Sequence, residues 1–260
     1  MRVGIIGFGN MGATFAVAFQ SKQRQVYVYD IDKKKTAGQK GFIISESSRA
    51  LIEKVEVVVL AIKPQDIKIF LNTIKDAFYK SKPLLITIAA GVSTKFFEKH
   101  IKGIRVVRAM PNLAAKVGQS MSFICKGKFA KEEDLAIAKD LLSSVGEVVT
   151  ISQDYIDKVT SIAGSGPGYI YYFMDCLYKG ALSLGFSKGL AKKMVIQTFL
   201  GAAALVKEEP LDFKEWVGKV ASKGGTTQAA LRLWQRNNLP VLVEEGIEAA
   251  LLKAKKLNLK

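Results

Sequence analysis

Three glycines near the beginning of the chain have the spacing of a turn that binds phosphate. Gly7, Gly9 and Gly12 follow the apolar run Val3–Ile6 and precede a helical pattern over Ala13–Gln20. In a strand–turn–helix setting the first glycine permits a tight turn, the second lets the backbone approach a pyrophosphate, and the third lets the helix pack on the strand. Free N–H groups and the dipole at the start of that helix favour negative charge. The pattern predicts a dinucleotide-binding turn, made of Gly7, Phe8, Gly9, Asn10, Met11 and Gly12.

An acidic residue stands where such a site needs a partner for ribose. Asp30 closes the apolar run Val26–Tyr29, at the spacing expected of a ribose-binding carboxylate. A carboxylate there accepts hydrogen bonds from the ribose hydroxyls of NADH and repels the extra phosphate of NADPH. The basic run Lys33–Lys35 counters that repulsion. On balance we expect a preference for NADH, with NADPH as the alternative.

Two further segments follow predicted strands, at the edge of the sheet where ligands bind in open α/β folds. The first contains Ala61, Ile62, Lys63 and Pro64, and the second contains Ala90 and Gly91. Their small residues leave room for a flat ring and a ribose. We expect both segments to border the cofactor, with Lys63 as a cation facing it, although a surface lysine before a proline turn is the alternative.

A second cluster of polar residues and glycines lies near the carboxyl end, from Ser222 to Thr227. Gly224, Gly225, Thr226 and Thr227 directly precede a predicted helix, so free N–H groups, the helix dipole and hydroxyls could hold an anion. The alternative is an ordinary threonine cap on a helix, with the glycines only turning the chain. A small carboxylate substrate would suit the first interpretation.

Several residue patterns of other enzymes are missing. His100 is the one histidine and has the setting of a solvated helix end, and the sequence contains no Cys/His pattern for a metal. The one Tyr-x-x-x-Lys pair, Tyr29 and Lys33, follows the strand at the adenosine end of the predicted site. A redox enzyme without a strong base suits a substrate that needs little proton abstraction, such as an imine.

These motifs must be positioned by an α/β sheet followed by a helical region. The predicted strands are Val3–Gly7, Val26–Asp30, Val57–Ile62, Leu84–Ala89, Arg105–Ala109, Met121–Cys125 and Glu147–Thr150. Helical patterns alternate with them over Met11–Gln20, Ser47–Lys54, Ile67–Phe78, Thr94–His100 and Lys131–Ser144. Such alternation indicates a Rossmann-like, doubly wound parallel sheet.

After residue 151 the strand pattern disappears. Helices are expected over Asp154–Ile162, Gly168–Leu184, Ser187–Lys207, Asp212–Val220, Thr226–Asn237 and Pro240–Leu257, with a break at Gly164–Gly168. The expected domains are a dinucleotide-binding domain over 1–152 and a helical domain over 153–260 for substrate binding and dimerisation. Tyr169, Tyr171, Tyr172 and Phe173 crowd one helix start, and we favour a subunit interface over packing within one chain.

Composition limits the class of protein. The chain has 260 residues, and 39 basic residues against 23 acidic ones give a net charge of +16. The lysines are spread along the chain rather than clustered with aromatic residues, so nucleic-acid binding is not expected. No run of 18 apolar residues or signal-peptide pattern is present, so we expect a cytoplasmic protein without a membrane span, with Cys125 and Cys176 as buried reduced thiols.

At these motifs the chain resembles the pyrroline-5-carboxylate reductases, the enzymes that make proline. The matching segments are Gly7–Gly12, Leu60–Gln65, Ile88–Val92, Arg108–Asn112, Leu141–Gly146, Gly164–Pro167 and Gly224–Thr227. The resemblance implies reduction of 1-pyrroline-5-carboxylate to L-proline with NADH or NADPH. It also implies a Rossmann domain and a helical domain that interlocks with its twin in a homodimer, often assembled into rings of dimers.

The same resemblance implies roles for individual residues. Ala61, Lys63 and Pro64 would border the nicotinamide, and the substrate carboxylate would lie on Ser222, Gly225, Thr226 and Thr227. Thr227 would also hydrogen-bond the ring nitrogen, as the catalytic residue. The chain departs from the family's pattern at Ser48, Leu113, Ala114, Ala163 and Lys223. Reduction of another small cyclic imine is therefore the alternative function, and a non-catalytic protein with the same fold is a third possibility.

Overall fold

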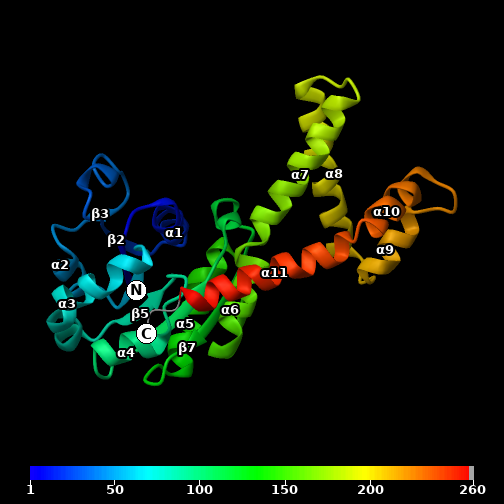
Figure 1. Cartoon of the computed structure of the whole chain (residues 1–260). Coiled ribbons are helices and arrows are strands. Elements are labelled where there is room, and N and C mark those ends of the chain that lie inside the picture. The colour runs from blue at the N-terminus through cyan, green and yellow to red at the C-terminus, as the bar shows by residue number, and fades with distance from the viewer. Residues whose placement is uncertain (258–260) are drawn as a thin grey trace. The chain divides into compact units, whose positions relative to one another are not determined.

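The chain folds into two compact units, described for residues 1–257 by a computed structural model (Figure 1). One unit comprises Met1–Pro167 together with the carboxyl-terminal residues from Ala250, and the other comprises Gly168–Ala249. The expected domain boundary at 152/153 lies earlier in the chain than this division. The difference arises because residues 153–167 and the end of α11 (Leu239–Lys256) group with the sheet rather than with the other helices.

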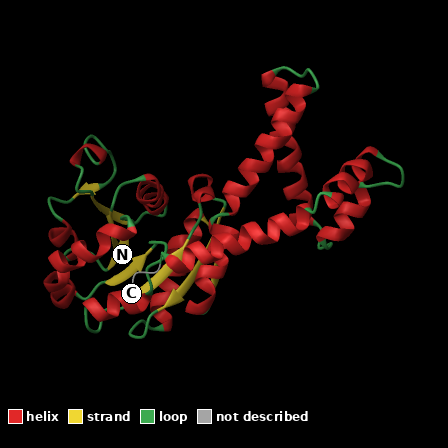
Figure 2. Cartoon of the chain, viewed as in Figure 1, coloured by secondary structure: helices red, strands yellow, loops and turns green. Residues whose placement is uncertain are grey.

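The first unit contains an eight-stranded sheet in the order β3-β2-β1-β4-β5-β6-β7-β8 (Figures 1 and 2). Its strands are β1 (Arg2–Ile6), β2 (Gln25–Tyr29), β3 (Ile43–Ile44), β4 (Val57–Leu60), β5 (Leu84–Thr87), β6 (Val106–Met110), β7 (Ser120–Lys126) and β8 (Gly146–Thr150). The prediction of a doubly wound sheet is confirmed. β2 and β3 lie on one side of β1, the chain then returns to place β4 on the other side, and β1 is parallel to β2. The short strand β3 was not predicted.

One pairing differs from the expected all-parallel arrangement. β7 runs antiparallel to β6, with Arg108 opposite Cys125, whereas β8 is parallel to β7. The connection from β6 to β7 contains only the 3-10 turn Leu113–Val117. A parallel return needs a crossover of a dozen or more residues, usually a helix, so this short connection forces the chain to turn back.

Helices cover both faces of the sheet and make it a buried layer. α1 (Asn10–Ser21) and α5 (Glu132–Leu142) belong to one apolar cluster, whereas α2 (Ser48–Ile52), α3 (Pro64–Ser81) and α4 (Thr94–His100) belong to the other. Strand β4 divides its side chains between them, with Val57 and Val59 in the first cluster and Val58 and Leu60 in the second. Alternate side chains of a strand point to opposite faces, which explains the continuous apolar runs of the sequence.

The remaining helices are α6 (Ile156–Val159), α7 (Gly166–Ser183), α8 (Lys188–Glu208), α9 (Phe213–Val220), α10 (Thr226–Arg236) and α11 (Leu239–Lys256). The expected break at Gly164–Gly168 is wrong. A π-helical segment over Thr160–Gly164 joins α6 to α7, and the Ser165 N–H donates to the Thr160 carbonyl at 2.9 Å. Because Pro167 falls in the first turn of α7, its missing N–H does not interrupt the helix.

The helical unit buries almost none of its own side chains. Within Gly168–Ala249 only Ala191 and Val195 are buried, and Tyr172 is 73% exposed. Cys176 is also exposed, so the expectation of two buried thiols holds for Cys125 alone. Among the described residues, α8 is the one helix long and apolar enough to cross a membrane by length and composition, and almost none of it is buried. An apolar surface of this extent needs a covering partner.

Candidate active site

Two of the three glycines in the amino-terminal turn are required by the protein's own packing. Gly7 has a φ of +95°, and a methyl group there would lie 2.5 Å from the Ala61 carbonyl oxygen. A methyl group at Gly12 would lie 1.9 Å from the Gly7 carbonyl oxygen. Both positions therefore exclude a side chain, because the turn and the start of α1 lie against β1 and the end of β4.

Gly9 lacks any such internal reason to be glycine. Its φ is −79°, which any residue adopts, and a methyl group there would meet no atom within 4 Å. Gly9 precedes α1 without a side-chain cap, and the first turn of α1 contains no acidic residue. The space at Gly9 and the open N–H groups of the helix start fit the close approach of a pyrophosphate. The turn therefore satisfies the requirement of a dinucleotide site.

The Asp30 carboxylate is tied to this turn. It is 7% exposed and accepts hydrogen bonds from the Phe8 N–H at 2.6 Å and from the Asp32 N–H at 2.8 Å. The Lys35 ammonium lies 3.3 Å from the same carboxylate. Asp30 thus stabilises the protein's own turn, and Lys35 partly offsets its charge. The sequence did not indicate either contact.

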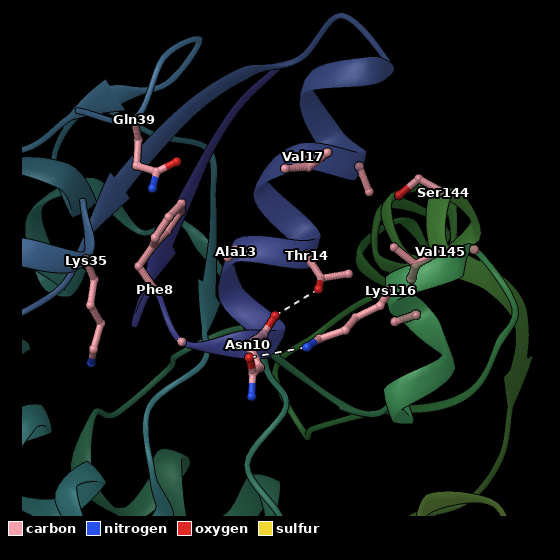
Figure 3. Close-up of a pocket in the computed structure, with 14 residues that line it drawn as sticks. Phe8, Asn10, Ala13, Thr14, Val17, Lys35, Gln39, Lys116, Ser144 and Val145 are labelled. Atoms are coloured by element: carbon pink, nitrogen blue, oxygen red, sulfur yellow. Dashed lines mark hydrogen bonds between the residues drawn. The ribbon is translucent and has the colours of Figure 1, made fainter. Parts of the chain in front are cut away.

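A groove of about 730 Å³ runs beside the turn and along α1. Its lining includes Phe8, Gly9 and Asn10, and Lys35 and Lys116 contribute its charged groups. Figure 3 shows these two lysines on opposite sides of Asn10. No acidic residue of the described chain lines the groove, so its electrostatic potential suits an anionic ligand.

The segments after β4 and β5 lie at the same edge of the sheet as the turn. The Ala61 N–H donates to the Ile6 carbonyl at 2.8 Å, which places the end of β4 beside the end of β1. Ile62 is half-buried, and Lys63 is exposed immediately before Pro64 opens α3. After β5, Ala90 is half-buried and Gly91 has a φ of +70°. The predicted cofactor residues after β4 thus lie beside the glycine turn and are at least partly accessible. After β5, Ala90 is partly accessible, whereas Gly91 is buried.

A buried arginine lies near the end of β6, and the sequence analysis did not identify its structural role. Arg108 is 1% exposed, and its Nη2 donates to Asp157 of α6 at 3.2 Å. Four residues further, Asn112 Nδ2 donates to the Ala163 carbonyl of the π-helical segment at 3.1 Å. These contacts join β6 to the helices that follow the sheet. An arginine inside an apolar strand is the signal that could have identified them.

Burial also changes the chemistry of Cys125, which lies opposite Arg108 in the sheet. Desolvation raises the pKa of the Cys125 thiol to about 11, with the Arg108 charge acting in the opposite direction. Desolvation likewise lowers the pKa of Arg108 from its ordinary value. Cys125 therefore stays a neutral thiol at physiological pH and is no nucleophile. At the end of α4, Nδ1 of His100 donates a hydrogen bond to the Phe96 carbonyl at 2.8 Å.

The second predicted site is a turn between α9 and α10. Gly224 has a φ of +75°, and the Gly225 N–H donates to the Ser222 carbonyl at 3.0 Å. Gly225, not a threonine, is the residue that precedes α10, so Thr226 and Thr227 occupy the first turn and neither caps the helix. The alternative of a threonine cap is wrong. The helix start keeps its N–H groups without a side-chain cap, and two hydroxyls lie beside them.

Known proteins match the chain along its length. The family model "Pyrroline-5-carboxylate reductase dimerisation" matches residues 153–257, and "NADP oxidoreductase coenzyme F420-dependent" matches residues 2–91. A pyrroline-5-carboxylate reductase of Aquifex aeolicus is 35% identical over 99% of this chain and 97% of its own. The chain belongs to the pyrroline-5-carboxylate reductase family.

Solved structures of this family share the fold. A pyrroline-5-carboxylate reductase of Coxiella burnetii has a TM-score of 0.91 and 31% identity, covering 99% of this chain and 98% of that one. A Plasmodium falciparum pyrroline carboxylate reductase with NADP bound has a TM-score of 0.91 and 26% identity, covering 100% and 98%. Members of the pyrroline-5-carboxylate reductase family are oxidoreductases that use a nicotinamide cofactor, and the helical region of this member is a dimerisation domain.

Proposed function

We propose that the protein reduces 1-pyrroline-5-carboxylate to L-proline with a reduced nicotinamide dinucleotide, as an enzyme of proline biosynthesis. The observation that carries this proposal is the full-length agreement with the reductases, at 35% identity and a TM-score of 0.91. The glycine turn supports it independently, because the start of α1 is open at Gly9 and leaves room for a pyrophosphate.

The cofactor is held by the turn and the adjacent strand ends in this proposal. Gly7–Gly12 offers N–H groups to the pyrophosphate, and Asp30 lies at the ribose of the adenosine half. Ala61–Pro64, Ala90 and Gly91 border the nicotinamide half. When bound, the reduced nicotinamide supplies the hydride for the imine carbon.

The substrate is held by the turn before α10. Ser222 and the N–H groups from Gly225 to Thr227 bind the carboxylate, and the Thr227 hydroxyl hydrogen-bonds the ring nitrogen, which gains a proton during reduction. Orientation of two flat rings supplies roughly 7–11 kcal/mol of barrier reduction at best. The protein therefore needs no strong base, in agreement with the lack of a histidine in either turn.

The choice of cofactor depends on the pair Asp30 and Lys35. The Asp30 carboxylate favours NADH by accepting from the ribose, but the ammonium of Lys35 at 3.3 Å offsets its charge. We propose that both NADH and NADPH are used and that Lys35 sets the ratio between them.

The active form is a cytoplasmic homodimer that covers the helical unit of each chain, and larger rings of dimers are compatible with the same interface. The exposed aromatic residues Tyr169–Phe173 support this assignment, and it explains the apolar surface of α8 without a membrane.

The direct test is oxidation of NADH with 1-pyrroline-5-carboxylate, repeated with NADPH and then with the six-membered cyclic imine. We expect turnover with both cofactors and at least tenfold higher kcat/KM for the five-membered ring, because one methylene in a fitted site is worth about 1–3 kcal/mol. A preference for the larger ring would assign a different imine as substrate. No turnover with either imine, in protein that binds the cofactor, would leave a non-catalytic protein with this fold.

A further inference from the structure

Lys116 lies beside the start of α1 although it is far away in the sequence. It belongs to the 3-10 turn Leu113–Val117 that follows β6, and its ammonium donates to the Asn10 side-chain oxygen at 3.3 Å. Asn10 is the first residue of α1. Figure 3 shows this contact as a dashed line at the mouth of the groove. The fold thus holds a lysine at the amino end of the helix that follows the glycine turn.

This position is electrostatically unfavourable for a cation in the free protein. The amino end of a helix carries partial positive charge and attracts anions, not ammonium groups. Among residues 1–257, no carboxylate forms an ion pair with Lys116, whereas Lys35 on the other side of Asn10 is paired with Asp30. The partner of Lys116 is a neutral amide. An anion placed at the helix start would turn the repulsion into attraction from two sides.

We propose that Lys116 is a cofactor-binding residue that donates to the pyrophosphate of the dinucleotide, in addition to the N–H groups of the glycine turn. This inference rests on the proposed function, because the anion is the pyrophosphate of the cofactor. The space at Gly9, adjacent to Asn10, is where the pyrophosphate approaches. Both cofactors share that group, so Lys116 strengthens the binding of NADH and NADPH alike. Lys35, in contrast, affects the preference between the two cofactors.

The test compares Lys116→Gln with Lys22→Gln. Lys22 follows the opposite end of α1 and is exposed, so its replacement removes the same charge from the same helix far from the groove. The dissociation constants of NADH and NADPH are measured by fluorescence titration without substrate, at two salt concentrations. For Lys116→Gln we expect binding of both cofactors to weaken about three- to tenfold, with a shallower salt dependence. Lys116→Arg should bind as the wild type does.

Four results would overturn the proposal. They are unchanged dissociation constants in Lys116→Gln, weakening for NADPH alone, equal weakening in Lys22→Gln, and a loss of binding accompanied by an unfolded circular-dichroism spectrum that Lys116→Arg shares. Failure of the wild-type protein to bind either dinucleotide would overturn the proposed function as well. Normal wild-type binding with an unaffected variant would overturn only the role of Lys116.

Discussion

The Asp30 carboxylate accepts a hydrogen bond from the Phe8 N–H over 2.6 Å, which ties the end of β2 to the middle of the glycine turn. The same carboxylate pairs with Lys35 at 3.3 Å. One buried acid therefore shapes the glycine turn and sets the local charge where we propose that the cofactor ribose binds. Its two effects can be separated by mutation, because only one of them involves Lys35.

Replacing Lys35 should change the preference between cofactors. In Lys35→Gln the charge of Asp30 is no longer offset, so we expect kcat/KM with NADPH to fall about three- to tenfold relative to that with NADH. Lys34→Gln is the control, because Lys34 is the neighbouring lysine and forms no ion pair with Asp30 in the described chain. Steady-state kinetics with both cofactors measures the ratio. An unchanged ratio would remove Lys35 from cofactor selection.

Alanine at Gly9 and at Gly12 should separate binding from folding. Gly12→Ala places a methyl group against the Gly7 carbonyl and should lower the free energy of unfolding by about 3 kcal/mol. Gly9→Ala meets no protein atom, so stability should fall by at most about 1 kcal/mol while cofactor affinity falls at least about tenfold. Thermal unfolding and cofactor titration measure the two quantities. Equal cofactor affinity in Gly9→Ala and wild type would contradict the assignment of the open space to a ligand.

Thr227 should contribute to turnover through its hydroxyl. Thr227→Ala should lower kcat about ten- to hundredfold, which corresponds to the loss of one donor worth ~1.4–2.8 kcal/mol in the transition state. Thr227→Ser keeps the hydroxyl and should retain most of the activity, whereas Thr227→Val keeps the shape and should not. Kinetics with saturating cofactor and 1-pyrroline-5-carboxylate measures kcat. Wild-type turnover in Thr227→Ala would remove this residue from the mechanism.

The buried thiol of Cys125 makes stability depend on alkaline pH. Its pKa is raised in the folded protein to about 11 from an ordinary value of 9.0, so the neutral thiol is favoured in the fold. The stabilisation is complete below pH 9 and is lost as the pH rises through 11, because the unfolded chain releases its proton first. The full loss of stability is about 3 kcal/mol. Urea unfolding from pH 8 to pH 11 should show that the free energy of unfolding falls more steeply with pH for wild type than for Cys125→Val. Parallel pH dependences of the two proteins would contradict this prediction.

The helical unit should lose its partner when a charge is placed on its exposed face. Tyr172→Glu introduces a carboxylate at a side chain that is 73% exposed in the single chain, and we expect the dimer to dissociate. Ile69→Glu is the matched control, because Ile69 on α3 is also 73% exposed but belongs to the sheet unit. Sedimentation at micromolar concentration distinguishes the species. A wild-type monomer, or a Tyr172→Glu dimer, would show that this face is not the interface.

The elements of the fold were accessible from the sequence because their patterns are local. Buried parallel strands appear as short continuous apolar runs, and helices as apolar residues with a period near 3.6, so β1, β4 and α4 were found nearly at their observed bounds. The glycine spacing and the acid at Asp30 predicted a dinucleotide-binding turn for the same reason. Short or irregular features escaped, such as β3 with two residues and the π-helical segment before α7.

Contacts between distant segments were decided by the tertiary structure alone. Lys116 meets Asn10 across 106 positions of the chain, and Asp30 bonds Phe8 across 22. Local sequence shows that Gly7, Gly9 and Gly12 are glycines, but only the packed neighbours show that two of them serve the fold and one leaves room for a ligand. Residue types and spacing determine which chemistry is available, whereas the folded backbone determines which groups lie within hydrogen-bond distance, because that distance depends on segments the local pattern does not contain.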